Sequence, residues 1–180
     1  MREYITLLEE KSKPQDIEII QLNFTEREVK PVMGSDTLEL HYEKLAKGYA
    51  KRYNNKEGDM DFNYAGYFLH NVWFAQFREV RNNNKPNGPM LGFINKHFGS
   101  YDKFKDEFED TAMKIQGSGW VYLAYDGSLK TIKNHEVRND ILLLVDWWEH
   151  AWAIDYRADK QNYLKNQWNI IDWNMINQRL

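Results

Sequence analysis

Residues 141–151 read I-L-L-L-V-D-W-W-E-H-A, and this stretch decides the fold. Its first five residues are apolar and mostly branched, a pattern that is typical of a strand buried on both faces. Asp146 follows at the carboxyl end of the predicted strand, where an ionised carboxylate needs a partner. His150 comes four residues later and can share the same site if the chain turns into a helix. A metal site and a capping aspartate beside a packed histidine explain this pair equally well.

The residues around this strand predict a small sheet with helices beside it. Residues 120–125 and 129–133 read as two further strands, and Asp126 and Gly127 form the hairpin turn between them. Helical segments are expected at residues 90–98, 101–115, 152–157, 161–165 and 168–177.

The amino-terminal half predicts a pair of helices. The first is expected from about residue 35 to residue 53, with Asp36 and Glu39 in a pattern like a capping box at its start. An aromatic-rich helix over residues 62–80 follows a short polar turn, so the two helices form an antiparallel hairpin. Before them, residues 17–22 predict only a local extended piece.

The clearest linker is the stretch N-N-N-K-P-N-G-P at residues 82–89. It divides the chain into residues 1–81, with the helical hairpin, and residues 90–180, with the sheet. We therefore expect an α+β fold, in which an amino-terminal antiparallel helical hairpin packs on a carboxyl-terminal α/β domain. That domain holds a three-stranded antiparallel sheet flanked by helices.

The composition of the 180 residues excludes several classes of protein. The net charge of −3 argues against a general nucleic-acid binder, whose surface would be basic. The absence of cysteine excludes disulfides, thiolate metal sites and a cysteine nucleophile. No apolar run approaches the length of a membrane span, and the amino terminus lacks the apolar core of a signal peptide. These features predict a cytoplasmic protein that binds neither membranes nor nucleic acid.

The five histidines include a candidate ligand set. His97 is expected at an exposed helix end. His41 and His70 lie on the two helices of the hairpin and can point into one gap, while Asp146 and His150 come from the opposite domain. Three imidazoles and one carboxylate would suit manganese, iron or zinc. A serine hydrolase is disfavoured because the G-S-G-W stretch at residues 117–120 is not a nucleophile elbow.

Several motifs resemble those of the iron/manganese superoxide dismutases. D-W-W-E-H-A at residues 146–151 resembles the D-x-W-E-H-A signature of that family. The stretches at residues 98–108 and 117–123 are similar to its middle segments. E-L-H at residues 39–41, followed by a tyrosine eight residues after the histidine, and A-G-Y-F-L-H at residues 65–70 are similar to its two ligand helices. The likeness extends from these helices to the carboxyl terminus.

The resemblance implies a redox site with one iron or manganese ion per subunit. Its ligands would be His41, His70, Asp146 and His150. The implied activity is disproportionation of superoxide to dioxygen and hydrogen peroxide. The main alternative is a non-catalytic, metal-binding relative with a structural role, although such relatives usually lose ligands. A mononuclear iron oxygenase and a zinc hydrolase are further alternatives.

The resemblance also assigns roles to residues around the ligands. Tyr49 and His135 would order solvent and help to deliver protons. Many members of the family carry glutamine at the His135 position or at the Gly66 position, and histidine at the His135 position also occurs. The implied aromatic cage is formed by Trp120, Tyr122 and Trp148.

The implied assembly is a homodimer, with Glu149 and Ser118 at the interface. Glu149 would reach a ligand histidine of the partner subunit. The chain departs from the family pattern at Leu45 and Ala153, where a histidine and a tyrosine usually meet across that interface. Asp159 falls near the usual place of a basic residue that flanks the substrate funnel, which weakens the expected steering of an anion.

Overall fold

A three-stranded antiparallel sheet lies at the centre of the computed structural model, which describes residue 14 and residues 16–180. The strands β1 (Gly119–Ala124), β2 (Leu129–Lys133) and β3 (Ile141–Asp146) lie in the order β2-β1-β3. Every residue of β1 and β3 is buried, as expected for strands that are covered on both faces. The predicted sheet and its hairpin are therefore confirmed. The register pairs Trp120 with Asp146, which places an indole beside the carboxylate.

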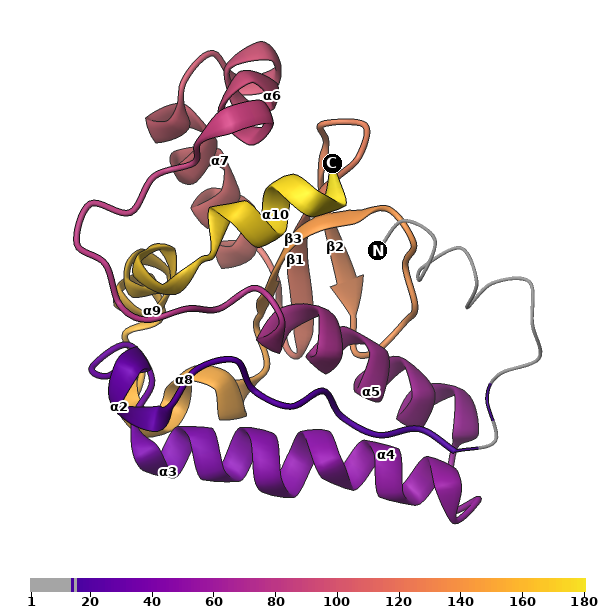
Figure 1. Ribbon diagram of the computed structural model, residues 1–180. Coiled ribbons are helices and arrows are strands. Elements are labelled where there is room, and N and C mark those ends of the chain that lie inside the picture. Colours follow the sequence, from indigo (N-terminus) through magenta and orange to yellow (C-terminus); the bar gives the residue numbers. More distant parts are fainter. Residues whose placement is uncertain (1–13, 15) are drawn as a thin grey trace.

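The amino-terminal hairpin lies against this sheet (Figure 1). Its first arm is a continuous helical run made of α3 (Ser35–Leu38), the π-helix η1 (Glu39–Ala46) and α4 (Lys47–Asn54). Its second arm is α5 (Met60–Phe74), which begins where Asp59 accepts a hydrogen bond from the backbone N–H of Phe62. The predicted antiparallel pair is present, although the π-helical stretch was not predicted.

The predicted end of the second helix was wrong, because α5 ends at Phe74 and not at residue 80. The backbone that follows bonds to the carboxyl-terminal region instead of continuing the helix. The Gln76 carbonyl accepts from the N–H of Asp172 at 2.7 Å, and the Arg78 N–H donates to the Ile170 carbonyl at 2.9 Å. These long-range bonds outweigh the helical preference of the sequence.

The predicted capping box at Asp36 and Glu39 was also wrong. The first arm is capped at Gly34, whose N–H donates to an Asp155 carboxylate oxygen at 2.7 Å. A capping box does occur earlier, where Thr25 and Glu28 close the start of a short helix, α2 (Glu26–Val29).

The carboxyl-terminal helices surround the sheet, and most follow the prediction with boundaries shifted by a few residues. The predicted helix over residues 168–177 was wrong, because Ile171 is extended and separates a 3₁₀ turn from the last helix. The predicted break between the first two carboxyl-terminal helices is present: Gly99 has a φ of +83° and ends one helix, and the Ser100 side chain caps the next. The helical elements are α6 (Gly88–Phe98), α7 (Tyr101–Met113), α8 (Glu149–Tyr156), α9 (Lys160–Gln167), the 3₁₀ turn η2 (Trp168–Ile170) and α10 (Trp173–Arg179).

An extended segment before α2 lies along the hairpin (Figure 1). Side chains bind its backbone: Asn54 bonds to both the N–H and the carbonyl of Ile17, and Asn71 accepts from the Ile20 N–H. The Tyr42 hydroxyl donates to the Ile20 carbonyl at 2.9 Å. The predicted absence of a signal peptide concerns residues that lie outside the described part of the chain.

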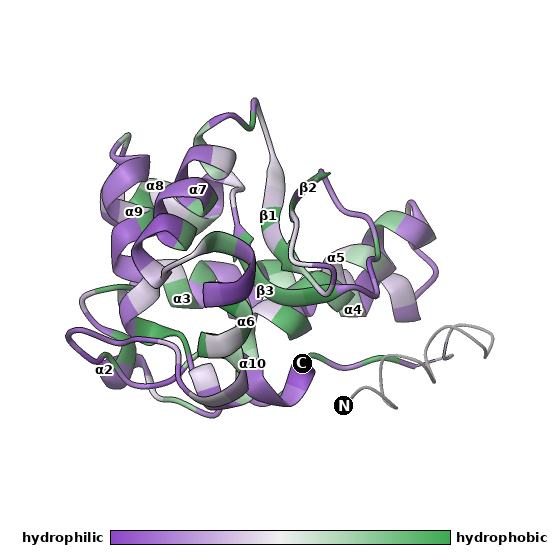
Figure 2. Cartoon of the chain, turned by 90° about the horizontal axis from the view of Figure 1, so that it is seen from above, coloured by the Kyte–Doolittle hydropathy of each residue, from purple (hydrophilic) through white to green (hydrophobic). Residues whose placement is uncertain are grey.

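The apolar core connects the hairpin with the sheet. Figure 2 shows the hydrophobic β3 in the middle of the molecule and mixed, amphipathic helices around it. None of the helices in the described residues is both long and apolar enough to cross a membrane. The proposed division at residues 82–89 stays a prediction.

Candidate metal centre

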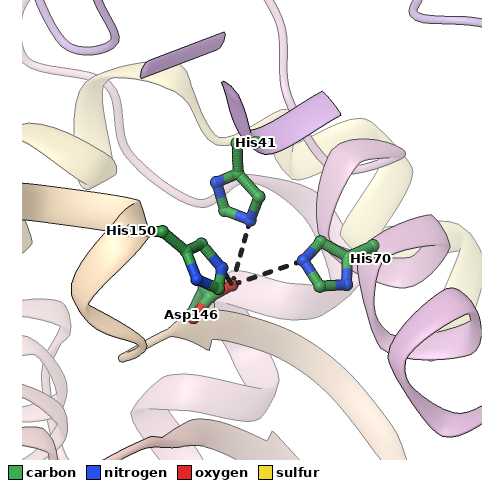
Figure 3. A group of neighbouring side chains, drawn as sticks. All are labelled: His41, His70, Asp146 and His150. Atoms are coloured by element: carbon green, nitrogen blue, oxygen red, sulfur yellow. Dashed lines mark ion pairs between the residues drawn. The ribbon is translucent and has the colours of Figure 1, made fainter. Parts of the chain in front are cut away.

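Four side chains from four elements meet between the hairpin and the sheet. They are His41 from η1, His70 from α5, Asp146 at the end of β3 and His150 in α8. Each offers one ligand atom, and these atoms lie within 4.8 Å of one another. Figure 3 shows the three imidazoles turned toward one oxygen of Asp146. The structure thus brings together the four residues that the resemblance implies as ligands.

The orientation of two of these side chains is fixed by hydrogen bonds on the side away from the centre. His70 Nδ1 lies 2.6 Å from the Gly66 carbonyl, which can only accept, so Nδ1 carries the proton and Nε2 presents its lone pair. Asp146 Oδ1 accepts from the Trp148 N–H at 2.7 Å. The other oxygen, Oδ2, faces the histidines.

The contacts inside the centre are close but are not hydrogen bonds. Asp146 Oδ2 lies 3.1 Å from His41 Nε2, 3.8 Å from His70 Nε2 and 3.5 Å from His150 Nε2. All four atoms are buried without a hydrogen-bond partner in the described residues. Native proteins rarely leave one buried polar atom unpaired, and here four converge. Their chemistry, three nitrogens and one carboxylate oxygen, fits iron or manganese.

The electrostatics of the centre favour the protonation states that a cation needs. Burial lowers the pKa of His41 to about 4 and that of His70 well below its ordinary value. Burial alone would raise the pKa of Asp146, but contacts with His150 and His41 outweigh it and hold that pKa well below the usual range. His41 and His70 are therefore neutral and Asp146 is ionised near neutral pH.

A second set of side chains forms a hydrogen-bonded chain beside the four candidate ligands. The Trp120 indole N–H donates to His135 Nδ1 at 3.1 Å, and His135 Nε2 lies 2.9 Å from the Tyr49 hydroxyl. Because Nδ1 of His135 accepts, Nε2 carries the proton and donates to Tyr49. Burial lowers the pKa of His135 to about 4, so this tautomer persists at neutral pH.

Aromatic rings surround both the four candidate ligands and the hydrogen-bonded chain through His135. Trp120 lies edge-on to His70 with the ring centres 5.1 Å apart, and Trp148 stacks on His135 at 4.5 Å. The sequence analysis did not assign Phe62 and Trp73 to the site, although Phe62 lies 4.7 Å from His135 and Trp73 lies 4.5 Å from His41. The position of Trp73, one turn after His70, was the available signal.

The remaining predicted residues lie at different distances from the centre. Tyr122 is buried in β1, where burial and the nearby Asp140 carboxylate raise the pKa of its hydroxyl. Glu149 is exposed at the start of α8, and Ser118 is half-buried before β1. Their roles in the cage and in an interface stay predictions.

Comparison with known proteins identifies the family. Residues 86–179 match the family described as iron/manganese superoxide dismutases, C-terminal domain. The chain is 34% identical to a manganese/iron superoxide dismutase of Porphyromonas gingivalis, with 90% of this chain and 98% of the relative aligned.

The chain belongs to the iron/manganese superoxide dismutase family. Two further relatives differ in the metal that their names give. An iron superoxide dismutase of Pyrobaculum aerophilum is 28% identical and a manganese superoxide dismutase of Mycolicibacterium smegmatis is 29% identical, each aligned over 84% of this chain and 86% of the relative.

The departures from the family pattern are visible in the structure. Leu45 in η1 and Ala153 in α8 are both half-buried and apolar. The Asp159 carboxylate caps α9 by accepting from the Asn162 N–H at 3.0 Å. Lys160 follows Asp159 directly in the sequence, and its ammonium lies 4.6 Å from the centre of the Trp152 ring.

Proposed function

We propose that this chain disproportionates superoxide to dioxygen and hydrogen peroxide at one iron or manganese ion per subunit. His41, His70, Asp146 and His150 would hold the ion. The observation that supports this proposal best is the convergence of four buried ligand atoms without hydrogen-bond partners. Membership of the superoxide dismutase family points the same way.

The bound ion would supply the one-electron chemistry, in which one superoxide gives up an electron and a second takes up an electron and two protons. The protein's own groups define the surroundings of that chemistry. The ionised Asp146 adds negative charge, which favours the higher oxidation state of a cation. The buried indoles of Trp120 and Trp73 limit access of bulk water.

Tyr49 and His135 are suited to hold a proton near the substrate. His135 donates to the Tyr49 hydroxyl oxygen, so the tyrosine O–H is directed away from His135. Burial raises the pKa of Tyr49 to about 12, and the hydroxyl therefore keeps its proton at neutral pH. We propose that Tyr49 donates a hydrogen bond toward the site and that His135 sets its direction.

The metal could be either iron or manganese. The usual glutamine of the family cannot occupy the Gly66 position without movement of Tyr49, because a Cβ there would lie 2.8 Å from two carbons of the Tyr49 ring. The His135 imidazole supports the proposal that histidine takes over the hydrogen-bonding role of that glutamine.

We also propose a homodimer. The exposed Glu149 lies next to the ligand His150 in sequence, which supports a contact from one subunit to the ligand histidine of its partner. Sedimentation velocity should give a dimer for the unchanged chain and a larger monomer fraction for Glu149→Ala. A purely monomeric unchanged chain would contradict the assembly.

A cytoplasmic location is a further prediction, which subcellular fractionation would test.

The decisive test of the function is a metal-resolved assay. The protein is loaded separately with iron and with manganese, the metal content per chain is measured, and dismutation is compared with that of the free ion. We expect activity well above the free ion with at least one metal, and loss of metal and activity in Asp146→Ala. Full metal occupancy without dismutation above that of the free ion would refute the proposed superoxide dismutase activity.

A further inference from the structure

The outer edge of β3 is closed by side chains. Within the described residues β3 pairs only with β1, so its other edge would present unpaired backbone groups. The Gln76 side chain bonds to both the carbonyl and the N–H of Leu144. Arg179 donates to the Leu142 carbonyl at 2.9 Å, and the Tyr163 hydroxyl donates to the Asp146 carbonyl at 2.8 Å.

Arg179 is unusual among these groups because it is a buried cation. Only 3% of the residue is exposed, and none of the described carboxylates forms an ion pair with it. Its partners are Gln76 Oε1 at 3.2 Å and the carbonyls of Val72 and Leu142 at 2.6 and 2.9 Å. Burying a charge is costly unless its hydrogen bonds are well placed, so these contacts require an explanation beyond packing.

The two carbonyls that Arg179 joins belong to the elements that carry two metal ligands. Val72 lies in the last turn of α5, two residues after His70. Leu142 lies in β3, four residues or about 13 Å of strand before Asp146. Gln76 makes a parallel connection, because it follows α5 in the chain and binds β3 at Leu144. One guanidinium and one amide thus fix the C-terminal end of α5 against the edge of β3.

We propose that Gln76 and Arg179 are positioning residues that set the spacing between His70 and Asp146 and thereby the affinity of the centre for its metal. This proposal rests on the proposed function, in which these two side chains are ligands. Neither positioning residue touches the metal. They act through α5 and β3, whose backbone they join.

The test compares Mn²⁺ binding and unfolding in the full chain and in Arg179→Met, which keeps an unbranched side chain but removes the guanidinium and its hydrogen bonds. Mn²⁺ affinity is measured by competition with a chelator, and thermal midpoints are measured with and without the metal. We expect about tenfold weaker Mn²⁺ binding, the scale found for partners of metal ligands. The midpoint should fall further in the metal-loaded protein than in the metal-free protein, and Arg27→Met, at an exposed arginine of α2, should change neither quantity.

Two further variants keep the proposal open to refutation. Arg179→Lys retains the charge but has one nitrogen, which is poorly suited to join Val72 and Leu142, so Mn²⁺ binding should stay weak. Recovery of affinity in that variant would show that charge and not spacing matters. If Arg179→Met does not fold, Gln76→Glu keeps the shape and the contact with Arg179 but loses the donor to Leu144, and it should also weaken binding.

The outcomes separate this inference from the proposed function. Absence of a one-to-one Mn²⁺ or Fe²⁺ site in the unchanged protein would refute the function itself. The positioning role would be refuted, and the function left intact, by a different result. In that case the unchanged protein and the variants bind Mn²⁺ equally tightly, and the thermal midpoint falls equally in the metal-loaded and the metal-free protein.

Discussion

The hydrogen bond from Trp120 to His135 decides which imidazole nitrogen carries a proton. With Nδ1 accepting from the indole, Nε2 must donate to the Tyr49 hydroxyl. A protonated imidazole would lose the bond from Trp120, because both of its nitrogens would then carry hydrogen. Trp120, which lies in β1, therefore sets the direction of both hydrogen bonds in this chain of side chains.

His135→Ala removes the central member of this chain. The Trp120 N–H loses its buried acceptor, which should lower the free energy of unfolding by about 1–3 kcal/mol. Dismutation should fall about ten- to a hundredfold, and the reduction potential should shift. Tyr49→Phe is the matched variant, because it removes only the hydroxyl and should reduce activity with less loss of stability. Unchanged potential and activity in His135→Ala would exclude a role for His135.

Gly66→Ala should disturb Tyr49, although alanine normally stabilises a helix interior. The added Cβ would lie 2.8 Å from two Tyr49 ring carbons, a separation that requires the ring to move. We expect lower stability and lower activity, measured by urea unfolding and by dismutation. Gly92→Ala in α6 is the control, because a Cβ added there would meet no atom within 4 Å. Its free energy of unfolding should rise by about 0.5–1 kcal/mol. Equal gains in both variants would contradict the close contact.

Prediction from sequence worked at the residue scale where side chains follow a local motif. The four candidate ligands lie together in the structure, and they could be chosen because His150 follows Asp146 closely and because His41 and His70 lie on paired helices. Gln76 and Arg179 were not found because their partners are distant in sequence. Gln76 binds Leu144, 68 residues away, and Arg179 binds Leu142, 37 residues away. No spacing rule connects an arginine in a terminal helix with a strand edge.

At the scale of elements, the first arm of the hairpin depends on a carboxylate from another helix. Asp155 in α8 accepts from the Gly34 N–H at the start of α3, and the Tyr156 hydroxyl donates to the Val32 carbonyl at 2.7 Å. These bonds hold the start of the helix that carries His41 against the helix that carries His150. The negative charge of Asp155 also interacts favourably with the dipole at the amino-terminal end of α3.

Asp155→Ala should lower the free energy of unfolding by about 1 kcal/mol, the usual effect of removing an amino-terminal cap. Urea unfolding measures this change. The control is Asp36→Ala, because Asp36 is exposed in the first turn and makes no cap in the structure. A larger loss in the control would show that the capping box expected from the sequence operates in solution.

The boundaries of the elements show where local patterns stop being informative. The strands and the break at Gly99 were predicted because apolar runs and turn residues are local properties of the sequence. The end of α5 was not, because the backbone at Gln76 and Arg78 bonds to residues near position 171. The π-helical turns around His41 likewise have no distinct sequence signal.

At the scale of the whole molecule, the buried histidines tie stability to pH. His41 and His135 have pKa values lowered to about 4 by burial, against an ordinary value of 6.5 in the unfolded chain. Between these values the unfolded chain binds more protons, so the free energy of unfolding decreases as pH falls. The effect is on the order of 3 kcal/mol for one such histidine.

Urea midpoints of the metal-free protein should therefore decrease steadily from pH 7 to pH 5. His97→Ala, at an exposed histidine, should leave this slope unchanged. A midpoint that stays constant across the range would show that the buried imidazoles are accessible to protons in the folded state.

The side chains that close the outer edge of β3 also protect the protein from aggregation through this strand. Five apolar residues without a charge, next to an open edge, form a template on which another chain could add a strand. In the folded protein Gln76, Arg179 and Tyr163 occupy the groups that such a strand would use. Detachment of α10 would free the Leu142 carbonyl and expose this edge, so partial unfolding at the end of the chain would start aggregation before the core itself opens.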